Sequence, residues 1–337
     1  MRKRCSRRYS LPLASLLIAL PVLAAPPPVP ETTDVPTLET LVVSGVQPGP
    51  GLWKVSRDGH VLWVLGTLAP LPKRMEWTSD EVRERIAASG IVLLSPKVDI
   101  STKGGALGGM FLLPAALRAR NNPDKQQLQD VLPAQDYARW QVLKARYLGR
   151  DRGVEKRRPI AAAMALREEA FDRSDLSWRD VVGREVKRAA RRSGVPIEQP
   201  TVSLRIENAR AALKEFSRNE LDDLECFRLT LDLDTLATRA NAWAMGEVAM
   251  LQDLPYADNR QACTEALLQT SLAESRGLTD LPGRVEATWL AAAKSALAEH
   301  PESFAVLPMS RITGERSYLR VLAEDGYFVE APEASQP

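Results

Sequence analysis

The chain has few residues that could carry out metal or nucleophilic chemistry, because only two of its 337 residues are histidines. His60 follows an Asp-Gly pair in an expected turn, and His300 precedes Pro301 at an expected helix end. Neither has a histidine or an acid three or four residues further on, as zinc-binding helices do. The chain also lacks a Gly-x-Ser-x-Gly elbow for a serine nucleophile. We therefore expect no metal and no other cofactor.

The elements that would position a site begin at residues 51–99. Two alternating apolar runs, 52–56 and 60–65, flank an Asp-Gly pair, which is a strong signal for a β-hairpin because both turn residues must tolerate a positive φ. A helix is expected to end at Gly90. The short apolar run Ile91 to Leu94 then predicts a buried strand, parallel to its neighbours.

This order of elements, with Trp53 in the first strand and Gly66-Thr67-Leu68 after the second, resembles the TraB/GumN family, which includes the Tiki metalloproteases. Weaker landmarks are Arg158-Pro159 and the run from Trp243 to Glu247. In that family a Gly-x-x-His motif follows the strand, a glutamate ends the next buried strand, and a second Gly-x-x-His motif lies near the C-terminus. The resemblance implies that these residues bind a metal ion.

The chain departs from the family pattern at each of these ligand positions. Gly66 is kept, but Ala69 stands in the first histidine position and Ser95 in the glutamate position. In the second motif Leu307 replaces the glycine and Ser310 the histidine. The resemblance therefore implies a diverged member that kept the scaffold and lost the metal site.

Two functions remain open. The first is an exported, non-catalytic protein, a pseudoenzyme of this family, that binds a peptide, a glycan or a protein partner in the cell envelope. Ala69, Leu307 and Ser310 together do not supply the several oxygen or imidazole ligands that a divalent cation needs. The second is a divergent metal-dependent hydrolase or peptidase, using Mn²⁺ or Co²⁺, whose site has moved to surviving acids such as Asp99 and Glu198.

The sequence predicts an α/β (α+β) fold. The N-terminal and C-terminal segments form a mixed central sheet, and the middle of the chain forms a large helical region, or lid. Residues 1–25 have the basic and apolar regions of a signal peptide, with cleavage expected near Ala24 and Ala25. Residues 26–45 form a proline-rich leader. The domain is expected over residues 46–333, with a helical insertion over about 104–300.

Charge and hydropathy exclude several partners. Without the five basic residues of the signal peptide, 40 lysines and arginines remain against 43 acids, a net charge of −3. This balance gives no support for nucleic-acid binding. The apolar run of the signal peptide is shorter than the ~20 residues that a spanning helix needs, so we expect no stable membrane span. The signal peptide predicts a periplasmic or secreted protein.

The middle of the chain predicts helices separated by loops. The glycine-rich segment Lys103 to Phe111 is expected to be a flexible loop, and residues 204–231 a single helix. Cys226 and Cys263 form an even pair once Cys5 is removed with the signal peptide. In a simple bundle, a helix of about 17 residues, roughly 25 Å long, would separate these two cysteines. A disulfide therefore requires a break near residues 232–234, and otherwise both thiols stay free.

Overall fold

A computed structural model of the chain describes residues 45–47, 49–77, 80–102, 105–253, 259–314 and 317–332. The expected signal peptide and nearly all of the proline-rich leader lie outside these residues. None of the described helices is both long enough and apolar enough to cross a membrane.

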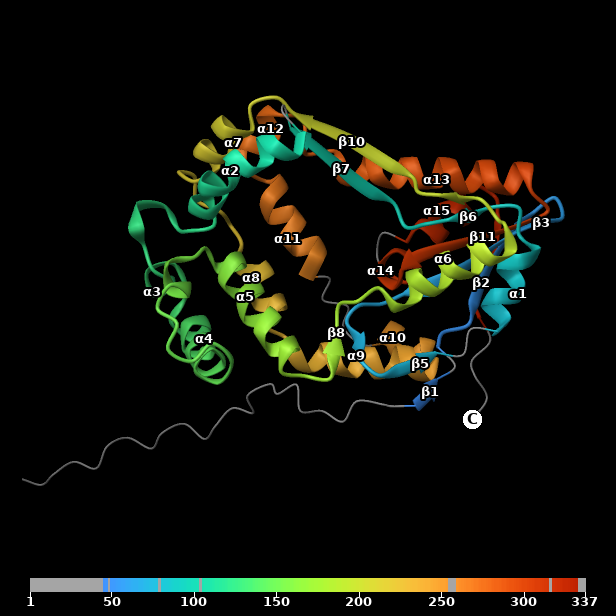
Figure 1. Cartoon of the computed structure of the whole chain (residues 1–337), viewed down its shortest axis with the longest axis horizontal. Helices are drawn as coiled ribbons and strands as arrows, with labels where there is room; N and C mark the ends of the chain where they lie inside the picture. The colour runs from blue at the N-terminus through green and yellow to red at the C-terminus, as the bar shows by residue number, and fades with distance from the viewer. Residues whose placement is uncertain are drawn as a thin grey trace, which may run out of the picture. The chain divides into compact units, whose positions relative to one another are not determined.

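A six-stranded mixed sheet is the centre of the fold (Figure 1). The strands, in order across the sheet, are β12 (Phe328–Glu330), β2 (Leu52–Arg57), β3 (His60–Thr67), β11 (Glu302–Pro308), β6 (Val92–Leu93) and β9 (Ile197–Glu198). The pairs on either side of β2 are antiparallel, and β3, β11, β6 and β9 run parallel. The predicted α/β class and the sheet built from both chain ends are confirmed.

The β2–β3 hairpin forms where the sequence predicts it. Asp58 and Gly59 connect the strands with φ values of 52° and 83°. Positive φ at both positions gives the turn the twist that matches the two strands. The register then pairs Trp53 with Val64 and Val55 with Leu62, and these four side chains are buried.

Strand β11 lies at the middle of the sheet and is buried from Ser303 to Leu307. Parallel strands need covering on both faces, which explains the continuous apolar run from Phe304 to Leu307. Helices pack around this part of the sheet and share one core with it. They include α1 (Asp80–Ala88), α6 (Val181–Ser193), α13 (Leu281–Glu299), α14 (Met309–Ile312) and α15 (Tyr318–Glu324).

A second core lies within the helical middle. It joins α4 (Ala134–Tyr147), α5 (Pro159–Asp172) and α8 (Leu224–Thr230) around buried Trp140, whose ring lies 5.9 Å from that of Phe227. The two cores are separate clusters of buried residues.

The remaining helices and strands of the described chain are β1 (Gly45–Gln47), β4 (Leu71–Pro72), β5 (Met75–Trp77), β7 (Lys97–Thr102), α2 (Gly105–Ala119), α3 (Leu128–Val131), β8 (Leu176–Ser177), β10 (Thr201–Ile206), α7 (Ala209–Phe216), α9 (Leu233–Met245), α10 (Val248–Asp253), α11 (Asn259–Leu268) and α12 (Ser271–Ser275), with two short 3-10 turns.

Two expectations for the middle of the chain are wrong. Of the segment expected to be a loop from Lys103 to Phe111, residues 105–111 belong to helix α2, and residues 103 and 104 lie outside the described residues. The alanines, leucines and methionine of this helix favour helical structure, and the helix packs on α7. Residues 204–231 are not one helix. They contain the end of β10, then α7 and α8, because β10 pairs in parallel with β7 and gains a full ladder of backbone hydrogen bonds.

Cys226 and Cys263 form a disulfide, with their Cα atoms 4.6 Å apart. The chain breaks between α8, which ends at Thr230, and α9, which begins at Leu233. This break turns the chain back so that α11, which carries Cys263, packs against α8. The bridge ties α11 to α8, which contributes Phe227 to the second core.

We predict that replacing both cysteines, Cys226→Ser with Cys263→Ser, lowers the free energy of unfolding by about 4 kcal/mol, because the bridge closes a loop of 37 residues in the unfolded chain. Urea unfolding of the two proteins measures the difference, and peptide mapping without reductant should find the two cysteines in one fragment. Two free thiols in the wild-type protein would contradict the prediction.

Candidate functional site

The carboxyl ends of the parallel strands bring the positions of the family motifs together. In the pairing of β3 with β11, Gly66 lies opposite Leu307 and Thr67 opposite Pro308. Ala69 and Ser310, three residues after this first pair, therefore follow the ends of adjacent strands. Ser95, after β6, donates a hydrogen bond from Oγ to the carbonyl of Val306, at 3.1 Å. All the expected ligand positions thus lie at one edge of the sheet, which we call the strand-end edge.

The side chains at the strand-end edge hold the strands together. Thr67 Oγ1 donates to the carbonyl of Leu307 at 3.2 Å, and Trp243 Nε1 donates to the carbonyl of Gly66 at 2.9 Å. Met309 packs so closely on Gly66 that a Cβ atom there would overlap its sulfur. Polar groups at this edge are therefore used in backbone contacts, and an apolar tryptophan and methionine fill the space beside them.

The two acids expected near the motif positions lie in different places. Glu198 ends β9 at the strand-end edge, where its carbonyl accepts from the backbone N–H of Leu94 at 2.8 Å and its side chain is exposed. Asp99 lies on β7, in a separate two-stranded sheet with β10, and is also exposed. Within the described residues, no group of three or more histidines, cysteines or acids is placed to hold a metal ion.

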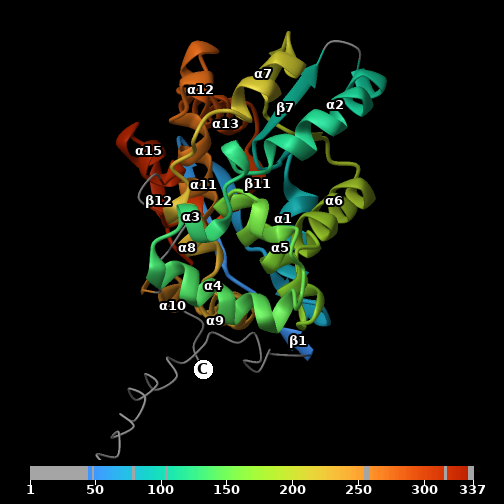
Figure 2. The ribbon, with the colours of Figure 1, turned by 90° about the vertical axis from the view of Figure 1, so that its left-hand side faces the viewer.

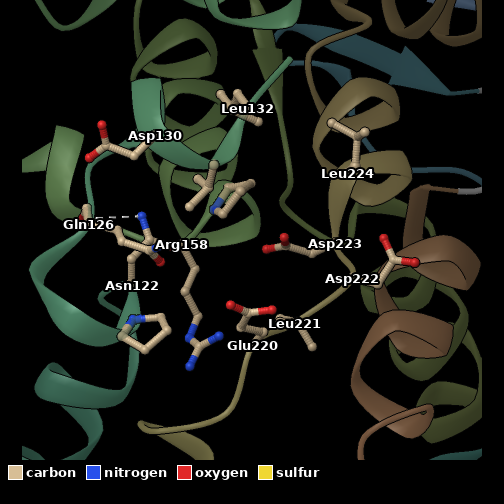
Figure 3. Close-up of a pocket in the computed structure, with 13 residues that line it drawn as sticks. Asn122, Gln126, Asp130, Leu132, Arg158, Glu220, Leu221, Asp222, Asp223 and Leu224 are labelled. Carbon is tan, nitrogen blue, oxygen red and sulfur yellow. Dashed lines mark hydrogen bonds between the residues drawn. The ribbon is translucent and has the colours of Figure 1, made fainter.

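The helical middle contains a cavity of about 330 Å³ that sequence reasoning missed (Figure 3). It lies where the start of α5 meets the end of α3 and the segment before α8. Its lining combines acids, apolar side chains and one buried arginine, and consists of Asn122, Pro123, Gln126, Asp130, Val131, Leu132, Arg158, Pro159, Glu220, Leu221, Asp222, Asp223 and Leu224. We call this space the α5 cavity. Its volume suits one side chain or sugar ring.

Arg158 holds the walls of the α5 cavity in place. Its Nε donates to the carbonyl of Ala119 at 3.1 Å, and its Nη2 donates to the carbonyls of Phe216 and Asn219, each at 2.7 Å. The guanidinium also lies over the ring of Phe216, at 4.7 Å from the centroid. Burial lowers the pKa of Arg158. The arginine therefore joins three segments of the chain, and its charge is satisfied mainly by backbone carbonyls.

Asp223 is the one acid of the α5 cavity that is buried, at 2% exposed. Its Oδ2 accepts a hydrogen bond from the backbone N–H of Ile160 at 2.7 Å, at the start of α5. Burial raises the pKa of Asp223 from 3.8 to about 6, although this hydrogen bond and the charge of Arg158 act in the opposite direction. In Figure 3 the side chains of Asp223 and Glu220 point toward Arg158. The cavity therefore presents carboxylates to whatever enters it.

The sequence carries a partial signal for this cavity. Pro159 marks the start of a helix, since its missing N–H costs little there. Asp222 and Asp223 directly precede the apolar start of α8. Neither signal shows that residues 158 and 223 lie together, because the contact depends on how the helices of the second core pack.

An α/β domain with this sheet, and with its motif positions at the strand-end edge, defines the class of protein. A model of the TraB/PrgY/gumN family matches residues 51–331. The chain therefore belongs to that family, as the sequence analysis expects. No curated protein and no solved structure matches the chain.

We predict that restoring the family ligands, with Ala69→His, Ser95→Glu and Ser310→His in one variant, creates affinity for a divalent metal, because the register of β3 and β11 brings these positions to one edge. At a free metal concentration about 100 times the Kd, the variant should gain about 2.7 kcal/mol of stability. Titration calorimetry with Mn²⁺, Co²⁺ and Zn²⁺ measures the affinity. The single variant Ala69→His is the control, and equal binding by both would contradict the prediction.

We also predict a pH dependence from Asp223. Its folded pKa of about 6 lies above the ordinary value of 3.8, so the native state binds the extra proton between these values. The contribution of Asp223 to the free energy of unfolding is therefore fully present below about pH 4 and is lost as the pH rises through 6. Asp223→Asn should remove the loss and raise the free energy of unfolding at pH 7.5 by up to about 3 kcal/mol.

Urea unfolding at pH 4.5 and pH 7.5 tests this pH dependence. The matched control is Asp222→Asn, which changes the exposed neighbour of Asp223. If Asp223→Asn has the same effect on stability at both pH values, the carboxyl of Asp223 does not retain its proton in the native state as predicted.

Proposed function

We propose that the protein is an exported, non-catalytic member of the TraB/PrgY/gumN family that binds a peptide, a glycan or a protein partner in the cell envelope. The observation that carries the proposal is the strand-end edge. The fold brings the motif positions together, yet they carry Ala69, Ser95 and Ser310, and the hydroxyl of Ser95 bonds to the backbone of β11. A scaffold that is kept while its ligand side chains are replaced supports binding without catalysis.

The α5 cavity is the binding site that this proposal favours. It lies in the helical middle, where a lid over the sheet would contact a ligand, and its exposed acids include Glu220 and Asp222. Because Arg158 already bonds to three backbone carbonyls, the carboxylates dominate the charge that a ligand meets. The cavity should therefore prefer a peptide with a basic side chain over an acidic one.

One observation favours a second function, a metal-dependent hydrolase or peptidase with a relocated site. Glu198 ends a strand that runs parallel to β6, so its carboxylate lies at the same edge as Ser95. It would need further ligands, such as Asp99, to hold Mn²⁺ or Co²⁺. Elemental analysis of the purified protein and a thermal-shift titration with these metals separate the two functions. A saturable shift that Glu198→Ala abolishes would support the hydrolase.

Binding at the α5 cavity is tested with an arrayed peptide library on the chain without residues 1–25. Peptides with lysine or arginine should bind, and Glu220→Lys should weaken them about tenfold, because it places a like charge at the cavity. The control is Glu225→Lys, which changes an exposed acid on α8 outside the cavity lining. Equal loss in both variants, or a preference for acidic peptides, would contradict the proposed site.

A further inference from the structure

Helix α2 exposes an apolar face that the proposed function does not use. Met110, Phe111, Leu113 and Leu117 are 63%, 68%, 55% and 44% exposed. Met110, Leu113 and Leu117 recur three and four residues apart and so lie along one side of the helix, with Phe111 beside them. A helix on a protein surface ordinarily has polar residues on its solvent side. The exposed side of α2 is instead suited to contact an apolar partner.

The opposite side of α2 is already packed. Ala119 is buried, and the helix contacts α7 and strand β7. Both views of the ribbon place α2 beside α7 and the end of β7 (Figures 1 and 2). We call the exposed apolar side of α2 the α2 face.

Basic side chains surround the α2 face. Arg118 lies in the last turn of α2, Arg120 directly follows the helix, and Arg210 on α7 donates to the carbonyl of Phe111 at 3.3 Å. All three are exposed, and none forms an ion pair with another described residue. In α2 and α7 the one acid is Glu215. The α2 face is therefore basic, although the net charge of the whole chain is close to zero.

We propose that the α2 face docks on a membrane surface that contains anionic lipid. Phe111, Met110 and Leu113 would enter the boundary between headgroups and acyl chains, and the arginines would contact the phosphates, as in amphipathic helices that lie in the interface. A second copy of the chain fits less well, because a symmetric contact would bring the same arginines together. This surface is separate from the α5 cavity, so the inference does not depend on the proposed function.

The test is flotation of the chain without residues 1–25 on vesicles of phosphatidylethanolamine with phosphatidylglycerol, and on vesicles of phosphatidylcholine alone. We expect binding to the anionic vesicles that weakens as salt rises. Phe111→Ser with Leu113→Ser should lower the partition coefficient at least tenfold. Arg118→Gln with Arg120→Gln should lower it roughly 30-fold at low salt.

Two matched controls separate this face from general stickiness or charge. Phe328→Ser removes a phenylalanine that is 64% exposed on β12, and Arg191→Gln with Arg192→Gln removes two exposed charges from α6. Both should bind as the wild type does. Equal losses in the controls, or equal binding to phosphatidylcholine, would overturn the proposal.

A direct signal comes from Phe111→Trp, which changes no charge. Its added fluorescence, after subtraction of the wild-type spectrum, should shift to the blue only with the anionic vesicles. An unshifted spectrum would overturn the proposal. So would sedimentation of a dimer that Phe111→Ser dissociates, because the α2 face would then be occupied by a second copy of the chain.

Discussion

The parallel pairing of β11 with β3 is the constraint on which the rest of the structure depends. Thr67 and Leu307, joined by a hydrogen bond across it, are 240 residues apart in the chain. Closing so long a loop costs entropy that only burial can offset, and β11 is buried from Ser303 to Leu307. Between β3 and β11 the chain returns to this sheet at β6 and β9, and its other described elements lie outside the sheet.

The same pairing fixes the positions that correspond to the family motifs. The backbone ladder holds Gly66 opposite Leu307 whatever side chains follow. At the edge itself Trp243 and Met309 fill space, and Trp243 Nε1 satisfies the carbonyl of Gly66. Burial and hydrogen bonding at this edge thus stabilise the sheet.

The sequence predicts what depends on local patterns. The turn at Asp58 and Gly59 and the mixed sheet are confirmed because turn chemistry and apolar periodicity decide them. Strand β10 was missed because its pairing with β7 is a long-range contact that the apolar spacing of residues 204–231 does not show. The α5 cavity was missed for the same reason, since Asp223 and Ile160 meet only through tertiary packing.

The separation of the two cores has a consequence for how such a protein changes its function. Buried residues around Trp289 belong to the sheet core, and those around Trp140 to the helical core. A substitution in the walls of the α5 cavity alters contacts of the helical core alone, so it need not disturb the strands. Arg158 stabilises these walls, because its hydrogen bonds to backbone carbonyls join three segments that have no common sheet. Surface residues of the helical middle can therefore diverge while β3 and β11 preserve the family fold.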